Sequence, residues 1–540
     1  MDIVSPKIVW QEYDREALPL DISVISDVTG EKQRVIRAYF NGVKPSETTF
    51  ARVFAKYATP LGDGPFPTAV IARDAGISAD SVDTLPFTSR GIAVCVVDYA
   101  GKRDDTPFYT IYPDTASYAD FTADCLASAP EDARNNCWIV WAKVLLRGIT
   151  FACSFAATDK ARVAVCGDGV AGASAWKACA VDETIAAGIS MYSSRFAPER
   201  GDNDPAYLVY EAALMEASYA PLIKVPLLVI AASNEQDDSI DDISEAYSMI
   251  PKLSGSRFSV SERMHHGTGV KQKNNMLLWL DYYLFGKGTI PQEPVLTASC
   301  SDHKLYFEIK TTADAETELF VSQAMQRGAL RNWHSEKLVQ TGDGEFVSRR
   351  EIFDVNKNVH AFVNIYTGDF SVSTPLLTKL PSAMGVTATP LKTSRLIYDS
   401  ESGIDDWTAF DENGGGSAKM AKGPFDIEGV CADGGSLMTY KLAEKQYKSS
   451  GDDLLQICLY CDTQQEITLV ITEKTVTGNE IKFGQYCAVV SIGPDDNWRK
   501  LNLEPSDFAS DTDVADSWAD IISLRIDGAR PVLVKSLLWV

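Results

Sequence analysis

The sequence predicts an α/β domain with a mainly parallel sheet and helices on both faces, followed by two all-β domains. Short apolar runs alternate with helical segments from about residue 65 to residue 287, as in parallel sheets whose crossovers are helices. After Pro291 the helical patterns nearly vanish and alternating, strand-like runs replace them. A chain of 540 residues is also long enough for two or three domains.

Residues 1–62 are predicted to form an N-terminal β-rich segment of the first domain, because strand-like runs such as RVIRAYF alternate with turns. The α/β domain itself spans residues 63–290. A helix is expected over Cys137–Phe155, and a final amphipathic helix over Asn274–Phe285 is ended by Gly286. The apolar runs expected as strands of its sheet are 68–72, 92–99, 161–166, 185–190, 226–232 and 257–261.

Residues 291–380 are predicted to be a β-sandwich, because alternating runs such as KLYFEIK and HAFVNIY are separated by turn residues. A stretch rich in Pro, Gly and Thr, KLPSAMGVTATPLKT, is interpreted as a linker. Residues 394–540 are again all-β, with a glycine-rich loop at Asn413–Gly416.

The net charge of −24 argues against nucleic acid and anionic membranes as partners, since their phosphates attract clusters of Lys and Arg. No stretch approaches the roughly 18 apolar residues of a membrane span, and the N-terminus lacks the apolar core of a secretion signal. Eleven scattered cysteines are typical of buried free thiols in a reducing compartment. A cytoplasmic protein is therefore expected.

Metal and cofactor signals are weak. Cys458 and Cys461 form a C-x-x-C pattern, but in a strand-like run residues three apart point to opposite faces. We therefore expect neither a zinc site nor a redox site there, and no cofactor elsewhere. One exception is a structural Ca²⁺, which the acidic loop at Ser400–Asp406 has the residue types to hold.

The stretch Arg162–Val181, RVAVCGDGVAGASAWKACAV, is the most informative part of the chain. A short apolar run typical of a buried strand leads into a turn of small residues, and helix-forming residues follow from Ala173. The sequence therefore predicts a sharp strand-to-helix turn. The small residues of this turn are Gly167, Gly169, Ala171 and Gly172.

This stretch resembles the nucleophile elbow of the α/β-hydrolase superfamily, G-x-S-x-G, in which a strained turn exposes a serine hydroxyl. In that register Gly169 stands at the serine position, so the nucleophile is replaced by glycine. The segments SRGIAVCVVDYAG, KVPLLVIAASNEQD and RMHHGTG resemble further parts of the superfamily in the expected order. The pattern is similar to acetylxylan-esterase-like and dienelactone-hydrolase-like members, which implies an α/β-hydrolase-like domain.

The C-terminal residues 394–540 resemble the galactose-binding-like jelly rolls of carbohydrate-binding modules. The segments that carry this resemblance are DNWRKLNLEPSDF and IISLRIDGARPVLVKSLLWV. The resemblance implies either sugar binding or a purely structural appendage, because such jelly rolls serve both purposes.

The hydrolase resemblance also implies a base and an acid. His266, directly before Gly267, matches the position of the base, and His265 is the second choice. Glu235 matches the acid that orients this base. Asp237 and Asp238 are alternatives for the same role.

Three neighbours of Gly169 are candidate substitutes for the missing serine. Asp168 precedes the nucleophile position by one residue, but this register places Val170 where the turn needs a small side chain. Cys166 is expected to point into the core, where burial makes a thiol inert. Ser174 lies one turn into the helix and out of position.

The oxyanion side of the site is also altered. Where relatives carry His-Gly after the first long strand, this chain has Arg73 and Asp74. Backbone donors need no particular side chain, and Val170 is expected to supply one of them. Arg73 is expected to pair with a carboxylate, Asp74 included.

These features favour a catalytically degenerate hydrolase-like protein that binds a small molecule, a glycan or a protein partner. One alternative is an active esterase of acylated sugars or other small esters, which uses a non-standard nucleophile or a water activated by histidine. Another is a structural or assembly protein. The sequence leaves the oligomeric state and the ligand open.

Overall fold

The computed structural model describes residues 3–44, 50–102, 106–113, 133–193, 205–235, 239–312, 315–324, 331–409, 418–451, 453–477, 480–494 and 497–540. Three features named above lie outside these residues: Asp237, Asp238 and the glycine-rich loop at Asn413–Gly416.

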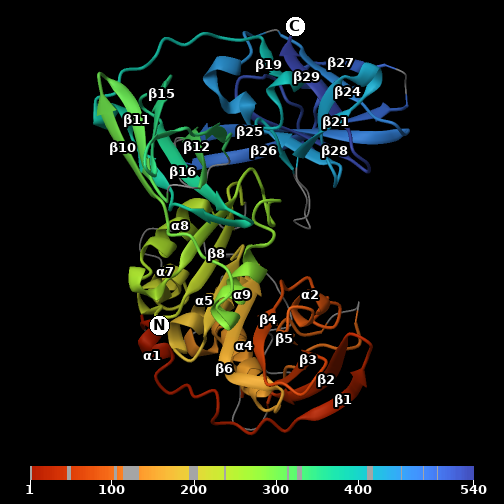
Figure 1. The fold of residues 1–540 in the computed structure, drawn as a ribbon. Helices are drawn as coiled ribbons and strands as arrows, with labels where there is room; N and C mark the ends of the chain where they lie inside the picture. The colour runs from red at the N-terminus through yellow and green to blue at the C-terminus, as the bar shows by residue number, and fades with distance from the viewer. Residues whose placement is uncertain are drawn as a thin grey trace. The chain divides into compact units, whose positions relative to one another are not determined.

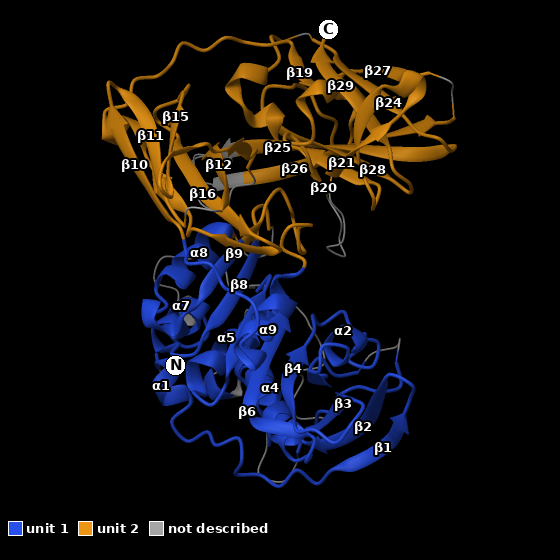
Figure 2. Cartoon of the chain, in the orientation of Figure 1, with its two compact units in different colours: residues 1–231, 240–259, 274–293 blue, residues 232–239, 260–273, 294–540 orange. Residues whose placement is uncertain are grey.

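The chain divides into two compact units, drawn in different colours in Figure 2. Unit 1 holds residues 1–231, 240–259 and 274–293, and unit 2 holds residues 232–239, 260–273 and 294–540. Two short segments from the predicted α/β domain, 232–239 and 260–273, therefore belong to the compact unit formed by the β domains. These segments carry the predicted acid and the predicted base.

The sheet of unit 1 has the strand order β1-β2-β3-β5-β4-β6-β7-β8-β9. Strands β1 to β3 are antiparallel neighbours and β3 pairs antiparallel with β5, whereas β5, β4, β6, β7 and β8 run parallel (Figure 1). The bounds are β1 Ser23–Thr29, β2 Gln33–Asn41, β3 Arg52–Pro60, β4 Phe66–Ala72, β5 Ala93–Val97, β6 Thr158–Asp168, β7 Ala187–Met191, β8 Leu227–Ala232 and β9 Arg257–Ser261.

Strands β5 and β8 are apolar throughout, as expected where both faces of a parallel strand are covered. Every residue of β5 and β8 is buried. Helix α4 packs on β4, β5 and β6, and α9 packs on β6 and β7, at the places where the sequence predicted helices. The helices of unit 1 are α1 Pro6–Val9, α2 Leu85–Thr88, α4 Cys137–Cys153, α5 Val170–Val181, α6 Pro205–Ala213, α7 Glu216–Tyr219, α8 Ile240–Ser248 and α9 Asn275–Phe285.

The first part of unit 2 is all-β, as its alternating sequence predicted. One antiparallel sheet has the order β10-β11-β15-β14, and a second run of antiparallel strands has the order β17-β16-β12-β13, with β18 paired to β16. The bounds are β10 Val295–Ser301, β11 Lys304–Lys310, β12 Glu316–Ala324, β13 His334–Lys337, β14 Gln340–Gly342, β15 Glu345–Arg350, β16 Asn358–Thr367, β17 Phe370–Ser373 and β18 Leu377–Lys379.

The C-terminal part of unit 2 has two further sheets, β21-β22-β29-β24-β27 with β19 beside β29, and β20-β23-β28-β25-β26. Leu455 of one sheet and Leu469 of the other belong to one fully buried core, so the two sheets pack face to face. The bounds are β19 Leu396–Asp399, β20 Thr408–Ala409, β21 Ala418–Lys422, β22 Glu428–Ala432, β23 Ser436–Thr439, β24 Leu455–Tyr460, β25 Gln465–Thr477, β26 Glu480–Ile492, β27 Arg499–Leu503, β28 Ile521–Gly528 and β29 Leu533–Trp539.

Two sequence features concern the cellular environment. Ten of the eleven cysteines lie in the described ranges, and none of these ten forms a disulfide. Among the described helices, none combines the length and the apolar character needed to cross a membrane.

The C-terminal sandwich depends on its shared core. Leu469 is fully buried, so Leu469→Ala is expected to lower the free energy of unfolding by about 2–5 kcal/mol through lost burial and a cavity. Glu466→Ala, an exposed change on the same strand, is the matched control and should stay within about 0.5 kcal/mol. Urea unfolding of both variants measures the difference, and equal losses would contradict the shared core.

Candidate functional site

The predicted turn between strand and helix is present in unit 1. Strand β6 ends at Asp168, helix α5 begins at Val170, and Gly169 between them has φ +54° and ψ −130°. Residues other than glycine rarely adopt this backbone conformation, whereas glycine adopts it without strain because it has no Cβ. The Gly169 N–H donates to the Met191 carbonyl at 3.0 Å, which fixes the turn to the neighbouring strand.

The small residues of the turn are needed because the backbone is crowded. A Cβ at Gly167 would lie 2.0 Å from the Ala171 carbonyl oxygen, and one at Gly172 would lie 2.8 Å from the Met191 carbonyl oxygen. Both neighbours are backbone atoms, which cannot move aside as a flexible side chain does. Packing against the backbone therefore requires glycine at positions 167 and 172.

The apex of the turn faces a carboxylate. A Cβ at Gly169 would lie 2.2 Å from Asp74 Oδ1 and 2.5 Å from Asp74 Cγ. The Val170 N–H donates to the same Asp74 oxygen at 3.2 Å. The side chain of Asp74 therefore occupies the space of a nucleophile's side chain and accepts the hydrogen bond of the predicted oxyanion donor.

Asp168 and Arg73 hold this arrangement together. Arg73 Nε and Asp168 Oδ2 are 2.6 Å apart, so Arg73 pairs with Asp168, one of the carboxylates available to it. Burial raises the pKa of Asp168, the Arg73 charge lowers it, and the Asp74 charge raises it again. Asp168 thus ties the segment that carries Asp74 to the end of β6.

The two other substitutes for serine are poorly placed for reaction. Cys166 is fully buried in β6, and burial raises the pKa of its thiol. A thiol held neutral is a weak nucleophile. Ser174 is buried within α5, one turn beyond the elbow.

The predicted acid and base lie in unit 2, on two loops that are bonded to each other. The Ser233 N–H donates to the Ser261 carbonyl at 3.0 Å, and the Asn234 N–H donates to the Met264 carbonyl at 2.9 Å. The Arg263 N–H donates to Ser233 Oγ at 2.7 Å. The loop after β8 and the loop after β9 therefore form one structure.

Glu235 and His266 meet within this structure. His266 Nδ1 lies 2.8 Å from Glu235 Oε2, and the glutamate side chain is only 4% exposed whereas the imidazole is 29% exposed. A carboxylate bonded to one imidazole nitrogen fixes the ring orientation and stabilises the protonated ring. The pair has the geometry of an acid that orients a base.

His265 is engaged differently. It is buried, and Tyr440 Oη lies 3.0 Å from its Nε2. Burial lowers the pKa of His265 to about 3, with a smaller contribution from the Arg525 charge. A histidine held neutral against a tyrosine is typical of a packed core, so His266 is the better placed of the two for proton transfer.

The β domains supply contacts to both loops that the sequence did not indicate. Trp333 Nε1 donates to Asn234 Oδ1 at 3.0 Å, and Asn234 Nδ2 donates to the Arg331 carbonyl at 3.0 Å. Tyr440 lies 175 residues from its partner His265. No local sequence pattern signals such long-range partners.

The acidic loop at residues 400–406 carries side chains that meet cations. Asp406 Oδ2 lies 2.6 Å from Lys441 Nζ, and Asp405 Oδ1 lies 3.3 Å from Arg263 Nη2. In the described part of the chain, no three His, Cys, Asp or Glu side chains converge as metal ligands would.

Comparison with known proteins gives structural likenesses only. No protein-family model matches the chain, and no curated protein matches it significantly. An acetyl xylan esterase from Paenibacillus sp. R4 matches at 16% identity and TM-score 0.39, over 53% of this chain and 97% of that chain. A glucuronoyl esterase from Solibacter usitatus matches at 14% identity and TM-score 0.36, over 51% of this chain and 92% of that chain.

An acetyl xylan esterase from Thermoanaerobacterium sp. JW/SL YS485 matches at 15% identity and TM-score 0.36, over 52% of this chain and 94% of that chain. Two classes that the sequence resemblance named, acetyl xylan esterases and dienelactone hydrolases, are thus among the structural neighbours. At these identities and TM-scores, the chemistry of those enzymes does not transfer to this chain.

The contact between the elbow and Asp74 predicts an energetic coupling. Gly169→Ala is expected to cost about 1–3 kcal/mol of unfolding free energy, because the positive φ and the Asp74 carboxylate both oppose a Cβ. Asp74→Ala removes the second obstacle, so the double variant should lose less than the sum of the single losses. Gly76→Ala, where a Cβ meets nothing within 4 Å, is the control. Strict additivity in urea unfolding would contradict the contact.

The burial of His265 predicts a pH dependence of stability. Its pKa falls from the ordinary 6.5 to about 3 on folding, so the unfolded chain binds the extra proton first as the pH drops. The contribution of neutral His265 to the unfolding free energy is therefore complete above pH 6.5. Below pH 6.5 it decreases by up to about 1.4 kcal/mol per pH unit. His265→Gln should remove this component, measured as a shallower decrease in unfolding free energy between pH 7.5 and 5. If the unfolding free energies of the unmodified chain and of His265→Gln changed with pH in parallel, this prediction would be wrong.

Proposed function

We propose that the chain is a catalytically degenerate α/β-hydrolase-like protein that binds a small molecule, a glycan or a protein partner. In this proposal residues 63–290 form the hydrolase-like domain, and a β-sandwich and a galactose-binding-like jelly roll follow. The strand order β3-β5-β4-β6-β7-β8-β9, with the sharp turn directly after β6, supports this fold.

The contact between Asp74 and the elbow carries the proposal. Acyl transfer needs a nucleophile at the apex and donors that stabilise a developing oxyanion. Here the apex is a glycine, and its neighbouring donor, the Val170 N–H, already binds the Asp74 carboxylate. A negative charge at this point repels the charge that the transition state develops.

The expected loss of activity is large. Removing a triad nucleophile typically lowers the rate by about 10⁴- to 10⁶-fold, and losing an oxyanion donor costs about 10²- to 10³-fold. These two changes affect different requirements of the same reaction. Together they argue against ester turnover at this turn.

A second candidate, an active esterase, is favoured by the pair of Glu235 and His266. Their 2.8 Å contact and the partial exposure of the imidazole are what a general base needs. In this reading His266 activates a water molecule. Asp168 is a less suitable nucleophile, because its carboxylate is buried against Arg73.

Turnover of p-nitrophenyl acetate separates the two candidates. The degenerate protein should hydrolyse it at the buffer rate, and His266→Ala should leave that rate unchanged. A fluorophosphonate probe should leave the chain unlabelled. Gly169→Ser should also stay inactive, because its side chain would meet the Asp74 carboxylate.

Turnover well above the buffer rate that disappears in His266→Ala would overturn the proposal and establish the esterase. Gln340→Ala, a change at an exposed position on β14 of unit 2, is the control for a non-specific loss of activity. A bell-shaped or sigmoidal pH–rate profile would then report the ionisation of the base.

A further inference from the structure

Unit 2 contains a cavity of about 560 Å³ that the hydrolase-like features do not use. Its walls come from the end of β12, the segment 331–334, the end of β15 with the loop after it, and the segment 440–447 of the C-terminal sandwich. The volume falls in the range of small-molecule sites, about 300–1,000 Å³. The cavity therefore has room for a ligand of monosaccharide to disaccharide size.

The cavity wall is rich in positive charge. Five cationic side chains line it against three carboxylates, in a chain whose net charge is −24. Arg350 Nη2 pairs with Glu336 Oε2 at 3.1 Å. Three of the other cations make no ion pair with any residue that the structure describes: Lys357, Lys445 and Arg349. The five cations are Arg331, Arg349, Arg350, Lys357 and Lys445.

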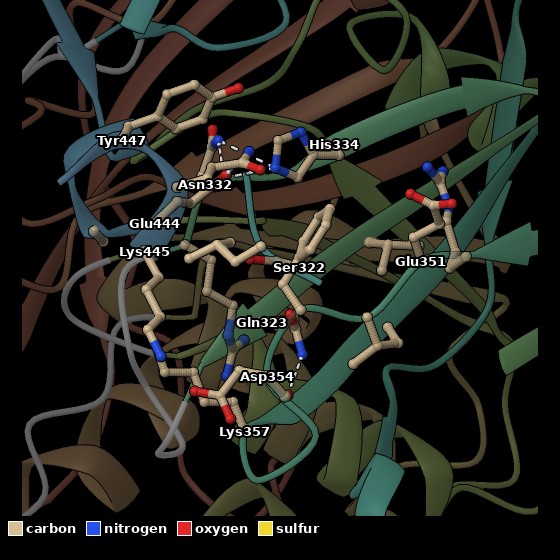
Figure 3. A pocket seen from close by; sticks show the side chains of 18 of the residues that line it. Ser322, Gln323, Asn332, His334, Glu351, Asp354, Lys357, Glu444, Lys445 and Tyr447 are labelled. Carbon is tan, nitrogen blue, oxygen red and sulfur yellow. Dashed lines mark hydrogen bonds and ion pairs between the residues drawn. The ribbon is translucent and has the colours of Figure 1, made fainter. Parts of the chain in front are cut away.

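One carboxylate of the wall is already engaged by its neighbours. Glu444 Oε1 lies 2.6 Å from Asn332 Nδ2 and 2.6 Å from His334 Nε2 (Figure 3). Burial opposes the charge of His334, but the hydrogen bond and charge of Glu444 raise its pKa above the ordinary value. Asn332 and His334 thus both engage one oxygen of Glu444, which ties this carboxylate into the wall.

The rest of the wall combines hydrogen-bonding groups with rings. Gln323 Nε2 donates to the Asp354 carbonyl at 3.0 Å, which fixes the amide at the cavity wall (Figure 3). Tyr447 and Phe353 add flat apolar surfaces to the lining. The hydroxyl groups of a ligand can hydrogen-bond to the amides and carboxylates of the wall, and the face of a sugar ring can pack on the aromatic rings.

We infer that this cavity binds a hydroxylated anion of sugar size, a sugar acid or a sugar phosphate, through its lysine and arginine side chains. Guanidinium groups match the oxygens of carboxylates and phosphates equally well, so the shared chemistry is an anionic group on a polyhydroxylated ring. All of the lining residues belong to unit 2, so the inference does not depend on whether the elbow of unit 1 is inactive.

Calorimetric titration of the full chain tests this inference with three probes: D-glucuronate, D-glucose 6-phosphate and uncharged D-glucose. At least one of the two anions should bind, and glucose should bind at least about tenfold more weakly. Binding of glucuronate alone identifies a carboxylate site, binding of the phosphate alone identifies a phosphate site, and binding of both identifies recognition of the anionic group. Raising the salt concentration should weaken the binding.

Variants locate the binding. Lys357→Ala combined with Lys445→Ala should weaken anion binding by about tenfold or more, since both ammonium groups are lost. Lys357→Arg keeps the charge and should retain binding. Lys304→Ala, an exposed lysine elsewhere in unit 2, is the matched control and should leave binding unchanged.

Three results would overturn the inference: no binding of either anion up to about 10 mM, equal binding of glucose, or equal weakening by the control variant. None of these results affects the ester-hydrolysis assay, so failure here and failure of the proposed function are distinguishable.

Discussion

The hydrogen bond from the Val170 N–H to the Asp74 carboxylate is the interaction on which the interpretation of unit 1 depends. It exists because Gly169 leaves the apex of a sharp turn without a side chain, and the aspartate fills that space. Arg73 and Asp168 then hold the aspartate's segment in place. The Asp74 carboxylate thereby occupies both the apex of the turn and the backbone donor beside it.

The acid and the base have a different structural setting. Their loops are fused by backbone hydrogen bonds and are embedded in contacts with the β domains, so Trp333 and Tyr440 support them. Side chains that orient a functional pair need such rigid support. The contact between Glu235 and His266 thus lies in a unit that is otherwise all-β.

The cavity of unit 2 has a cationic wall and shares one residue with the support of the His loop. The cavity of this strongly acidic chain is lined by three cations that pair with no described carboxylate, Arg349, Lys357 and Lys445, and an anionic ligand would offset their charge. Tyr440 belongs to this cavity wall and also contacts His265, the neighbour of the candidate base. A ligand in the cavity would therefore lie against a residue that supports the His loop.

Local sequence patterns determined the strands, the main helices and the turn at Gly169, because these depend on apolar periodicity and on residues that only a tight backbone requires. The family resemblance named Glu235 and His266 as first choices for the acid and the base, with Asp237, Asp238 and His265 as alternatives, and it placed Asp74 in the altered oxyanion segment. Only the tertiary structure decided that the Asp74 carboxylate lies at the elbow, that Tyr440 binds His265, and that distant cations share one cavity. Such contacts join residues far apart in the chain, and their geometry is set by packing rather than by neighbouring residues.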